Sequence, residues 1–118
     1  MLLGKEQILN AKDLRSEDVE CPEWEGTVRV KTMTGAERDD FEQKVFNSKG
    51  NDKEGNVKMY RAKLLVYTCV DVDNNLLFNE KDIESLGKKS SVPIDRLATA
   101  SMKVNGLLAS DIEEVIKN

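Results

Sequence analysis

Apolar and polar residues alternate near the start of the chain and recur at helical spacing further along. Residues 18–24 and 26–33 have a period of two, which places Val28 and Val30 on one face of an extended strand. The connection between the two segments contains Gly26 and suits a tight turn. The pattern therefore predicts an antiparallel β-hairpin.

Three features refine this hairpin. Pro22 marks its first strand as an edge or irregular strand, because proline cannot donate to a ladder. Trp24 is expected to anchor the turn by core packing, with contact to a partner as the alternative. Ahead of the hairpin, residues 4–14 combine Ile8 and Leu9 with charged residues and predict a short amphipathic helix.

The rest of the chain has the signals of helices. Residues 34–49 begin with Thr34 and Glu37, which have the spacing of a capping box, and Phe41 and Val45 lie four apart on one face. Their spacing predicts a helix with one buried side.

Further helices are predicted from local signals. Residues 57–70 are apolar on most faces, which is typical of a helix in the centre of a bundle. A helix over residues 79–87 has Asn79 as its N-cap. Another follows within residues 90–106, with Pro93 in its first turn and Gly106 at its end. A last helix is predicted over residues 110–118.

The fold class predicted is α+β and mainly α-helical, with an N-terminal β-hairpin followed by a bundle of four to five helices. A chain of 118 residues is expected to form a single domain, residues 1–118. Residues 47–56 have no apolar side chain and predict a flexible loop. Such a loop is a solvated connector or a segment that orders on binding.

Composition limits the function. The net charge is −4 and the pI is near 5.0, which argues against nucleic acid as a partner. No apolar run approaches the roughly 20 residues that span a membrane, and we expect a cytoplasmic protein. The acidic stretch of residues 12–25 is a solvated face or, alternatively, a docking surface. Cys21 and Cys69 have no metal-binding spacing and are expected to be reduced thiols.

The chain has no histidine, and none of the common catalytic motifs is present. We therefore expect no enzyme and no cofactor.

One stretch has the spacing of a calcium-binding loop. Asp71, Asp73 and Asn75 stand at positions one, three and five of a twelve-residue EF-hand loop. Position six is Leu76 in place of glycine, and position twelve is Asp82 in place of glutamate. The residues favour a plain Asp/Asn turn, with a degenerate calcium site as the less favoured alternative.

The order of segments resembles that of the tail assembly chaperones of long-tailed bacteriophages and prophages (siphophages). The family has the pattern V-x-V-P-E-W-G-G-x-V-x-V-R-x-L-T-G-x-E-R-D-x-F-E after a short helix, and this chain has VECPEWEGTVRVKTMTGAERDDFE. Cys21 stands where the family usually has an aliphatic residue. The agreeing residues are Val19, Pro22, Glu23, Trp24, Gly26, Val28, Val30, Thr34, Gly35, Glu37, Arg38 and Phe41.

A second part of the resemblance lies downstream, over residues 61–107. Asn75 replaces the turn glycine frequent in the family. The agreeing residues are Arg61, Asp71, Leu77, Phe78, Asp82, Leu86, Lys89, Ser90, Arg96, Asn105, Gly106 and Leu107.

The resemblance implies a non-enzymatic protein that binds the tape measure protein and helps to recruit the major tail tube protein during tail morphogenesis. It also implies self-association as a homo-oligomer, action in the bacterial host cytoplasm, and absence from the mature virion. A small structural adaptor of the virion, such as a connector or tube component, is the alternative.

The C-terminal apolar residues are the predicted partner-binding surface, and closing the core is the alternative role for them. These residues are Leu107, Leu108, Ile112, Val115 and Ile116.

Overall fold

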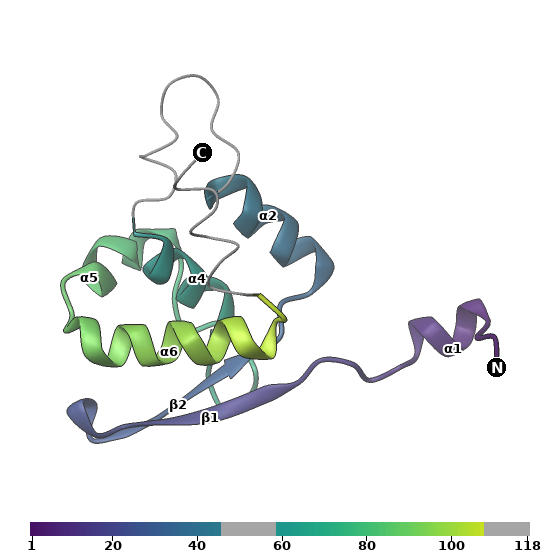
Figure 1. Cartoon of the computed structure of the whole chain (residues 1–118), viewed down its shortest axis with the longest axis horizontal. Helices are drawn as coiled ribbons and strands as arrows, with labels where there is room; N and C mark the ends of the chain where they lie inside the picture. Colours follow the sequence, from purple (N-terminus) through teal and green to yellow (C-terminus); the bar gives the residue numbers. More distant parts are fainter. Residues whose placement is uncertain (46–58, 108–118) are drawn as a thin grey trace.

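The structure, a computed structural model, describes residues 1–45 and 59–107. Strands near the N-terminus are followed mostly by helices, which confirms the α+β prediction (Figure 1). The elements in order are α1 (Lys5–Leu9), β1 (Ser16–Cys21), a 3-10 turn (Pro22–Trp24), β2 (Gly26–Lys31), α2 (Gly35–Val45), α4 (Tyr60–Thr68), β3 (Cys69–Val70), a second 3-10 turn (Glu80–Asp82), α5 (Ile83–Gly87) and α6 (Ser91–Val104).

The sheet has three antiparallel strands in the order β1-β2-β3, so the hairpin prediction was incomplete. Val19 pairs with Val28 across the hairpin, and Val30 pairs with Cys69 of β3. The sequence predicted a helix through Val70, but α4 ends at Thr68. Pairing with β3 satisfies backbone groups on the second edge of β2, which a helical continuation would leave open.

The hairpin connection also differs from the tight turn that was expected at Gly26. Pro22 to Trp24 form a 3-10 turn, and Glu25 then takes the left-handed conformation with φ of 56°. Pro22 therefore lies in the connection and not in the strand. Trp24, the last residue of the 3-10 turn, is half-buried and packs against the core, as was expected.

The capping box at the start of α2 is confirmed. The hydroxyl of Thr34 accepts a hydrogen bond from the amide of Glu37 at 3.1 Å, and the carboxylate of Glu37 accepts one from the amide of Thr34 at 2.9 Å. Phe41 and Val45 are buried, as their spacing predicted. Ahead of α5, the side chain of Asn79 caps the second 3-10 turn by accepting a hydrogen bond from the amide of Lys81 at 2.8 Å.

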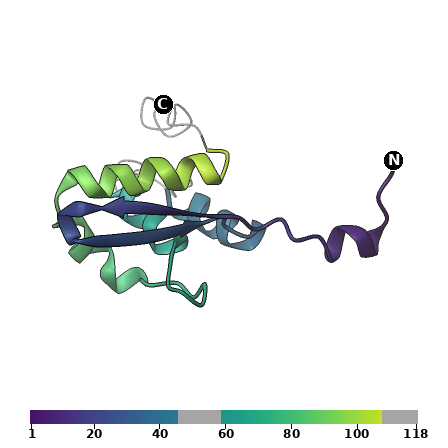
Figure 2. The ribbon, with the colours of Figure 1, turned by 90° about the horizontal axis from the view of Figure 1, so that it is seen from below.

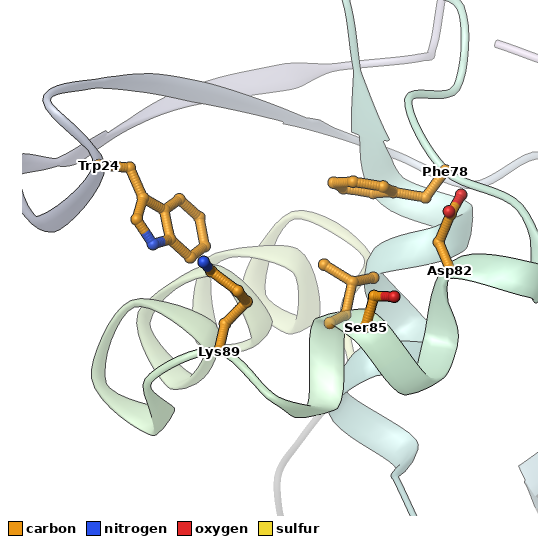
Figure 3. A pocket seen from close by; sticks show the side chains of 6 residues that line it. Trp24, Phe78, Asp82, Ser85 and Lys89 are labelled. Atoms are coloured by element: carbon orange, nitrogen blue, oxygen red, sulfur yellow. The ribbon is translucent and has the colours of Figure 1, made fainter.

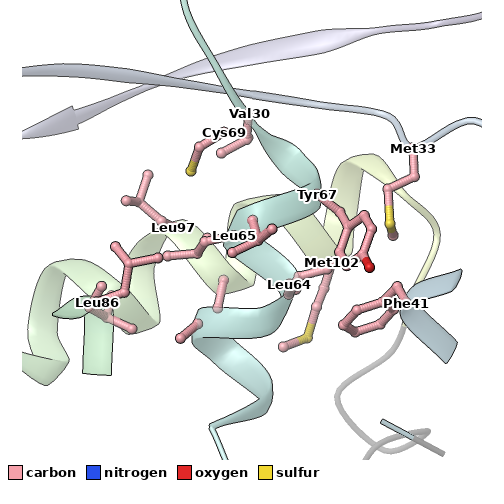
Figure 4. Packing of buried hydrophobic residues seen from close by; sticks show 14 of the residues in the cluster. Val30, Met33, Phe41, Leu64, Leu65, Tyr67, Cys69, Leu86, Leu97 and Met102 are labelled. Carbon is pink, nitrogen blue, oxygen red and sulfur yellow. The ribbon is translucent and has the colours of Figure 1, made fainter. Parts of the chain in front are cut away.

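α4 lies in the middle of the core, as predicted (Figure 4). Leu64 and Leu65 are fully buried, and α4 packs against α2, α5, α6 and the sheet. Between α4 and α6, the buried hydroxyls of Thr68 and Ser101 lie 2.9 Å apart, and that of Thr68 also donates to the carbonyl of Leu64. Two buried polar groups are thereby satisfied in an apolar surrounding.

α6 has the buried face that the sequence predicted, and Asn105 at its end joins it to the sheet. The side-chain oxygen of Asn105 accepts from the amide of Met33 at 2.7 Å, and its amide donates to the carbonyls of Lys31 and Ser101. Gly106 then ends the helix with a φ of 67°, and Leu107 returns to the core.

The Asp/Asn turn after β3 binds its own backbone. One carboxylate oxygen of Asp71 accepts from the amides of Asp73 and Asn75 at 2.8 and 3.0 Å. The left-handed residue is Asn74, with φ of 66°, so Leu76 at EF-hand position six has no positive φ. The turn interpretation is therefore confirmed.

The predicted N-terminal helix is shorter than expected. It forms over Lys5–Leu9, and none of its residues is buried. Cys21 and Cys69 are free buried thiols, and burial raises the pKa of Cys69 to about 12. The predicted loop 47–56 and the predicted helix 110–118 lie outside the described residues.

We expect Asn105→Ala to lower the free energy of unfolding by about 2 kcal/mol, because the amide of Met33 would lose its partner in a partly buried place. Urea unfolding followed by circular dichroism measures this change. Asn75→Ala, at an exposed position in the turn, is the matched control and should change stability little. Equal effects of the two substitutions would contradict the assignment.

Candidate functional site

A hollow of about 350 Å³ lies between the tip of the hairpin and α5 (Figure 3). Trp24 and Phe78 stand on opposite sides of it, and Asp82, Ser85 and Lys89 lie along the helical side. Its lining residues are Trp24, Phe78, Asp82, Ser85, Leu86 and Lys89.

The hairpin side of the hollow is held by an ion pair between distant parts of the chain. Arg96 of α6 donates to both carboxylate oxygens of Glu23, at 2.7 and 2.8 Å. This hydrogen bonding lowers the pKa of Glu23 to about 2 and raises the pKa of Arg96. Trp24 follows Glu23 directly, so the pair ties the backbone beside Trp24 to α6.

The helical side is set by local structure. Phe78 is half-buried against the core just before the N-cap Asn79. The carboxylate of Asp82 accepts a hydrogen bond from the amide of Asn79 at 2.9 Å, so it also serves the cap. Leu86 is 7% exposed and forms the apolar floor, while Ser85 and Lys89 are exposed at the rim.

This arrangement suits non-covalent binding. An aromatic pair over an aliphatic floor accepts apolar side chains, and Lys89 at the rim attracts an acidic group. Within residues 1–45 and 59–107, no group of three or more acidic or thiol side chains is placed to hold a metal ion. The hollow is a candidate site for an apolar side chain of a partner.

Of the predicted partner-binding residues, the structure describes Leu107 alone, and it does not line this hollow. Leu107 is 5% exposed and packs in the core. Leu108, Ile112, Val115 and Ile116 lie outside the described residues, so a C-terminal contact surface stays a prediction.

Sequence reasoning missed the hollow because its two sides come from segments far apart in the chain. A signal was nevertheless present. Every lining residue except Ser85 is among the residues on which the resemblance to the chaperone family rests.

In the part of the chain that the structure describes, no helix has the length and apolar character needed to cross a bilayer.

The fold is that of a small α+β protein, and its described residues include an open apolar hollow. A family model described as phage tail assembly chaperone matches residues 5–118. The chain belongs to this family, as its sequence patterns indicated. It is therefore a non-enzymatic chaperone of phage tail assembly, whose partners are phage tail proteins.

The fold is similar to a solved structure described as that of the bacteriophage HK97 tail assembly chaperone. The TM-score is 0.59 at 22% sequence identity, with 84% of this chain and 94% of that chain covered. A comparison with curated protein sequences gives no match.

The ion pair beside Trp24 predicts a dependence of stability on pH. Because the pKa of Glu23 falls from 4.5 to about 2 on folding, its contribution is complete above pH 4.5 and is lost as the pH falls to about 2. We expect Glu23→Gln to lower the melting temperature at neutral pH and to have little effect near pH 2. Thermal unfolding across this range measures the difference, and Glu25→Gln, at an exposed position in the same connection, is the control. A difference that does not change with pH would contradict the pairing.

Proposed function

We propose that this protein binds the tape measure protein through the hollow beside Trp24 during tail morphogenesis. The observation that carries the proposal is an exposed apolar hollow with an aromatic residue on each side, in a chain of the tail assembly chaperone family. A site of this kind accepts the apolar face of an amphipathic helix, whose side chains enter as spaced anchors.

A chaperone of this kind must cover the apolar surface of a long partner, and the hollow suits that task. A long partner with apolar helical stretches aggregates unless those stretches are covered. The hollow has a volume of only about 350 Å³ and is open to solvent, so we expect each contact with a long partner to be weak and replaceable. Several copies are then needed along one partner, and the high charge of the chain keeps the covered complex soluble.

The proposal has three further parts. The protein helps to recruit the major tail tube protein, it self-associates, and it acts in the host cytoplasm. We also propose that the C-terminal residues Leu108, Ile112, Val115 and Ile116 add a second apolar contact to the partner.

Co-expression with the tape measure protein of the same phage, followed by solubility measurement and pull-down, tests the hollow. We expect Lys89→Glu and Ser85→Trp to reduce the recovered tape measure protein by about tenfold, the first by reversing the rim charge and the second by filling the space. Both positions are exposed, so folding should be retained.

Lys88→Glu is the matched control, because it makes the same charge change at an exposed neighbour that does not line the hollow. Unchanged binding by both hollow variants would overturn the hollow as the site. Loss of binding in Ile112→Glu alone would then move the contact to the C-terminal residues.

A chaperone and a structural adaptor differ in the finished particle. We expect mass spectrometry of purified virions to detect the tape measure and tube proteins without this chain, while lysates of infected cells contain it. Its presence in virions in a fixed ratio to the tube protein would favour the adaptor.

A further inference from the structure

One edge of the sheet is unpaired in the described part of the chain. β1 stands first in the order β1-β2-β3, so only one of its two sides meets a strand. The amide of Thr32 donates to the carbonyl of Arg15 at 2.8 Å, so the backbone groups of Arg15 point toward the second strand of the hairpin. Because backbone direction alternates along an antiparallel strand, the N–H and C=O groups of Ser16, Asp18 and Glu20 point outward.

These outward groups are nearly all open among the described residues. The carbonyl of Glu20 accepts a long contact of 3.5 Å from Arg96, and the N–H and C=O groups of Ser16 and Asp18 have no partner in the same part of the chain. All three strand residues are exposed. α6 lies along one side of the strands, and no described segment lies over the hairpin in the view of Figure 2. Such an edge is a template for a strand from another chain.

The charge of this edge limits which strand it can accept. β1 contains Glu17, Asp18 and Glu20 and no basic residue. Within the described residues, Asp18 is in an ion pair with Arg29, while Glu17 and Glu20 are in none. The open backbone groups are therefore flanked by two uncompensated carboxylates.

The basic residues around β1 leave this charge in place. Three of them are already engaged, in the pairs Arg29–Asp18, Lys31–Glu37 and Arg96–Glu23. Arg15, just before the strand, and Lys103, on α6, form no ion pair with a carboxylate of β1 among the described residues. Residues 12–25 as a whole have six acidic and two basic side chains, so the surrounding stretch is acidic as well.

We infer that the edge of β1 takes up an extended segment of another protein as an added strand, and that this segment has lysine or arginine at alternate positions. Every second side chain of an added strand would stand on the face of Asp18 and Glu20, where a basic group meets carboxylates. The side chains between them would lie on the face of Val19, which is buried, so apolar residues suit those positions. Main-chain hydrogen bonds supply affinity in this mode of binding, and alternate side chains supply specificity.

A second copy of this chain does not match the edge. Pairing of two β1 strands would set Glu17, Asp18 and Glu20 of one copy against the same residues of the other, and like charges on neighbouring strands are destabilising. The occupant is therefore a different protein with a basic extended segment. The partners of this family are phage tail proteins, so the segment is expected in one of them.

This contact is separate from the proposed binding of the tape measure protein at the hollow. None of Ser16, Asp18 and Glu20 lines the hollow beside Trp24. The two contacts can therefore fail independently in an experiment.

Fluorescence anisotropy of the full chain with labelled peptides tests the inference. The probe is Thr-Lys-Val-Lys-Val-Lys-Thr, and the comparison peptide, Thr-Lys-Lys-Lys-Val-Val-Thr, has the same composition with its lysines together. We expect the alternating peptide to bind about tenfold more tightly, because only its lysines all lie on one face of a strand. Equal affinity of the two peptides, or no binding of either, would overturn the inference.

Variants of the edge separate backbone pairing from charge. Ser16→Pro removes an outward N–H and Glu20→Lys reverses a charge, and we expect each to weaken binding of the alternating peptide by about tenfold. Ser16→Ala, which keeps the N–H, is the control for the first. Glu84→Lys, the same charge change at an exposed position on α5, is the control for the second. Melting temperatures of all four variants verify that folding is retained.

Amide hydrogen exchange followed by NMR gives the decisive result. The alternating peptide should slow exchange at Ser16, Asp18 and Glu20, whose amides point outward, and leave Glu17 and Val19 unchanged because those amides already face the second strand. Binding without slower exchange at Ser16 and Asp18 would overturn strand addition.

The same peptide separates this inference from the proposed function. Lys89→Glu should bind the alternating peptide like wild type while losing the tape measure protein. A chain that ignores the peptide but still binds the tape measure protein would refute the edge contact and leave the hollow standing.

Discussion

The attachment of α6 to the sheet is the constraint on which the rest of this structure depends. A two-stranded hairpin is marginally stable in water and β3 adds only 2 residues, so the sheet depends on α6, which packs against β1 and β2. Polar contacts attach α6 at two places. Arg96 binds Glu23 at the hairpin tip, and Asn105, just after the helix, binds the backbone at and after the end of β2. With α6 in place, α4 is enclosed between the sheet and the other helices, and the core closes around Leu64 and Leu65.

The hollow beside Trp24 follows from the same attachment. Trp24 is carried by a connection that includes a left-handed Glu25. The bidentate contact of Arg96 with Glu23 joins this connection to α6, and Trp24 stands opposite Phe78 across the hollow (Figure 3).

Local signals explain what the sequence could predict. The capping residues Thr34 and Asn79 and the apolar face of α6 act within one or two helical turns, and all were found from spacing alone. The third strand and the hollow could not be found in this way. Cys69 pairs with Val30, and Arg96 binds Glu23 from 73 positions away, so both depend on the closed fold. The family resemblance supplied part of what local signals missed. The residues on which it rests include Glu23, Arg96 and most of the residues that line the hollow.

The exposed apolar residues are separated in a way that suits an assembly factor. One patch that served every partner would make the partners compete, while separate patches leave each contact independent. Here residues 1–14, the turn after β3 and the hollow beside Trp24 are three different places among the described residues. In the proposed function, weak contacts at the hollows of several copies bind one long partner far more tightly than any single contact.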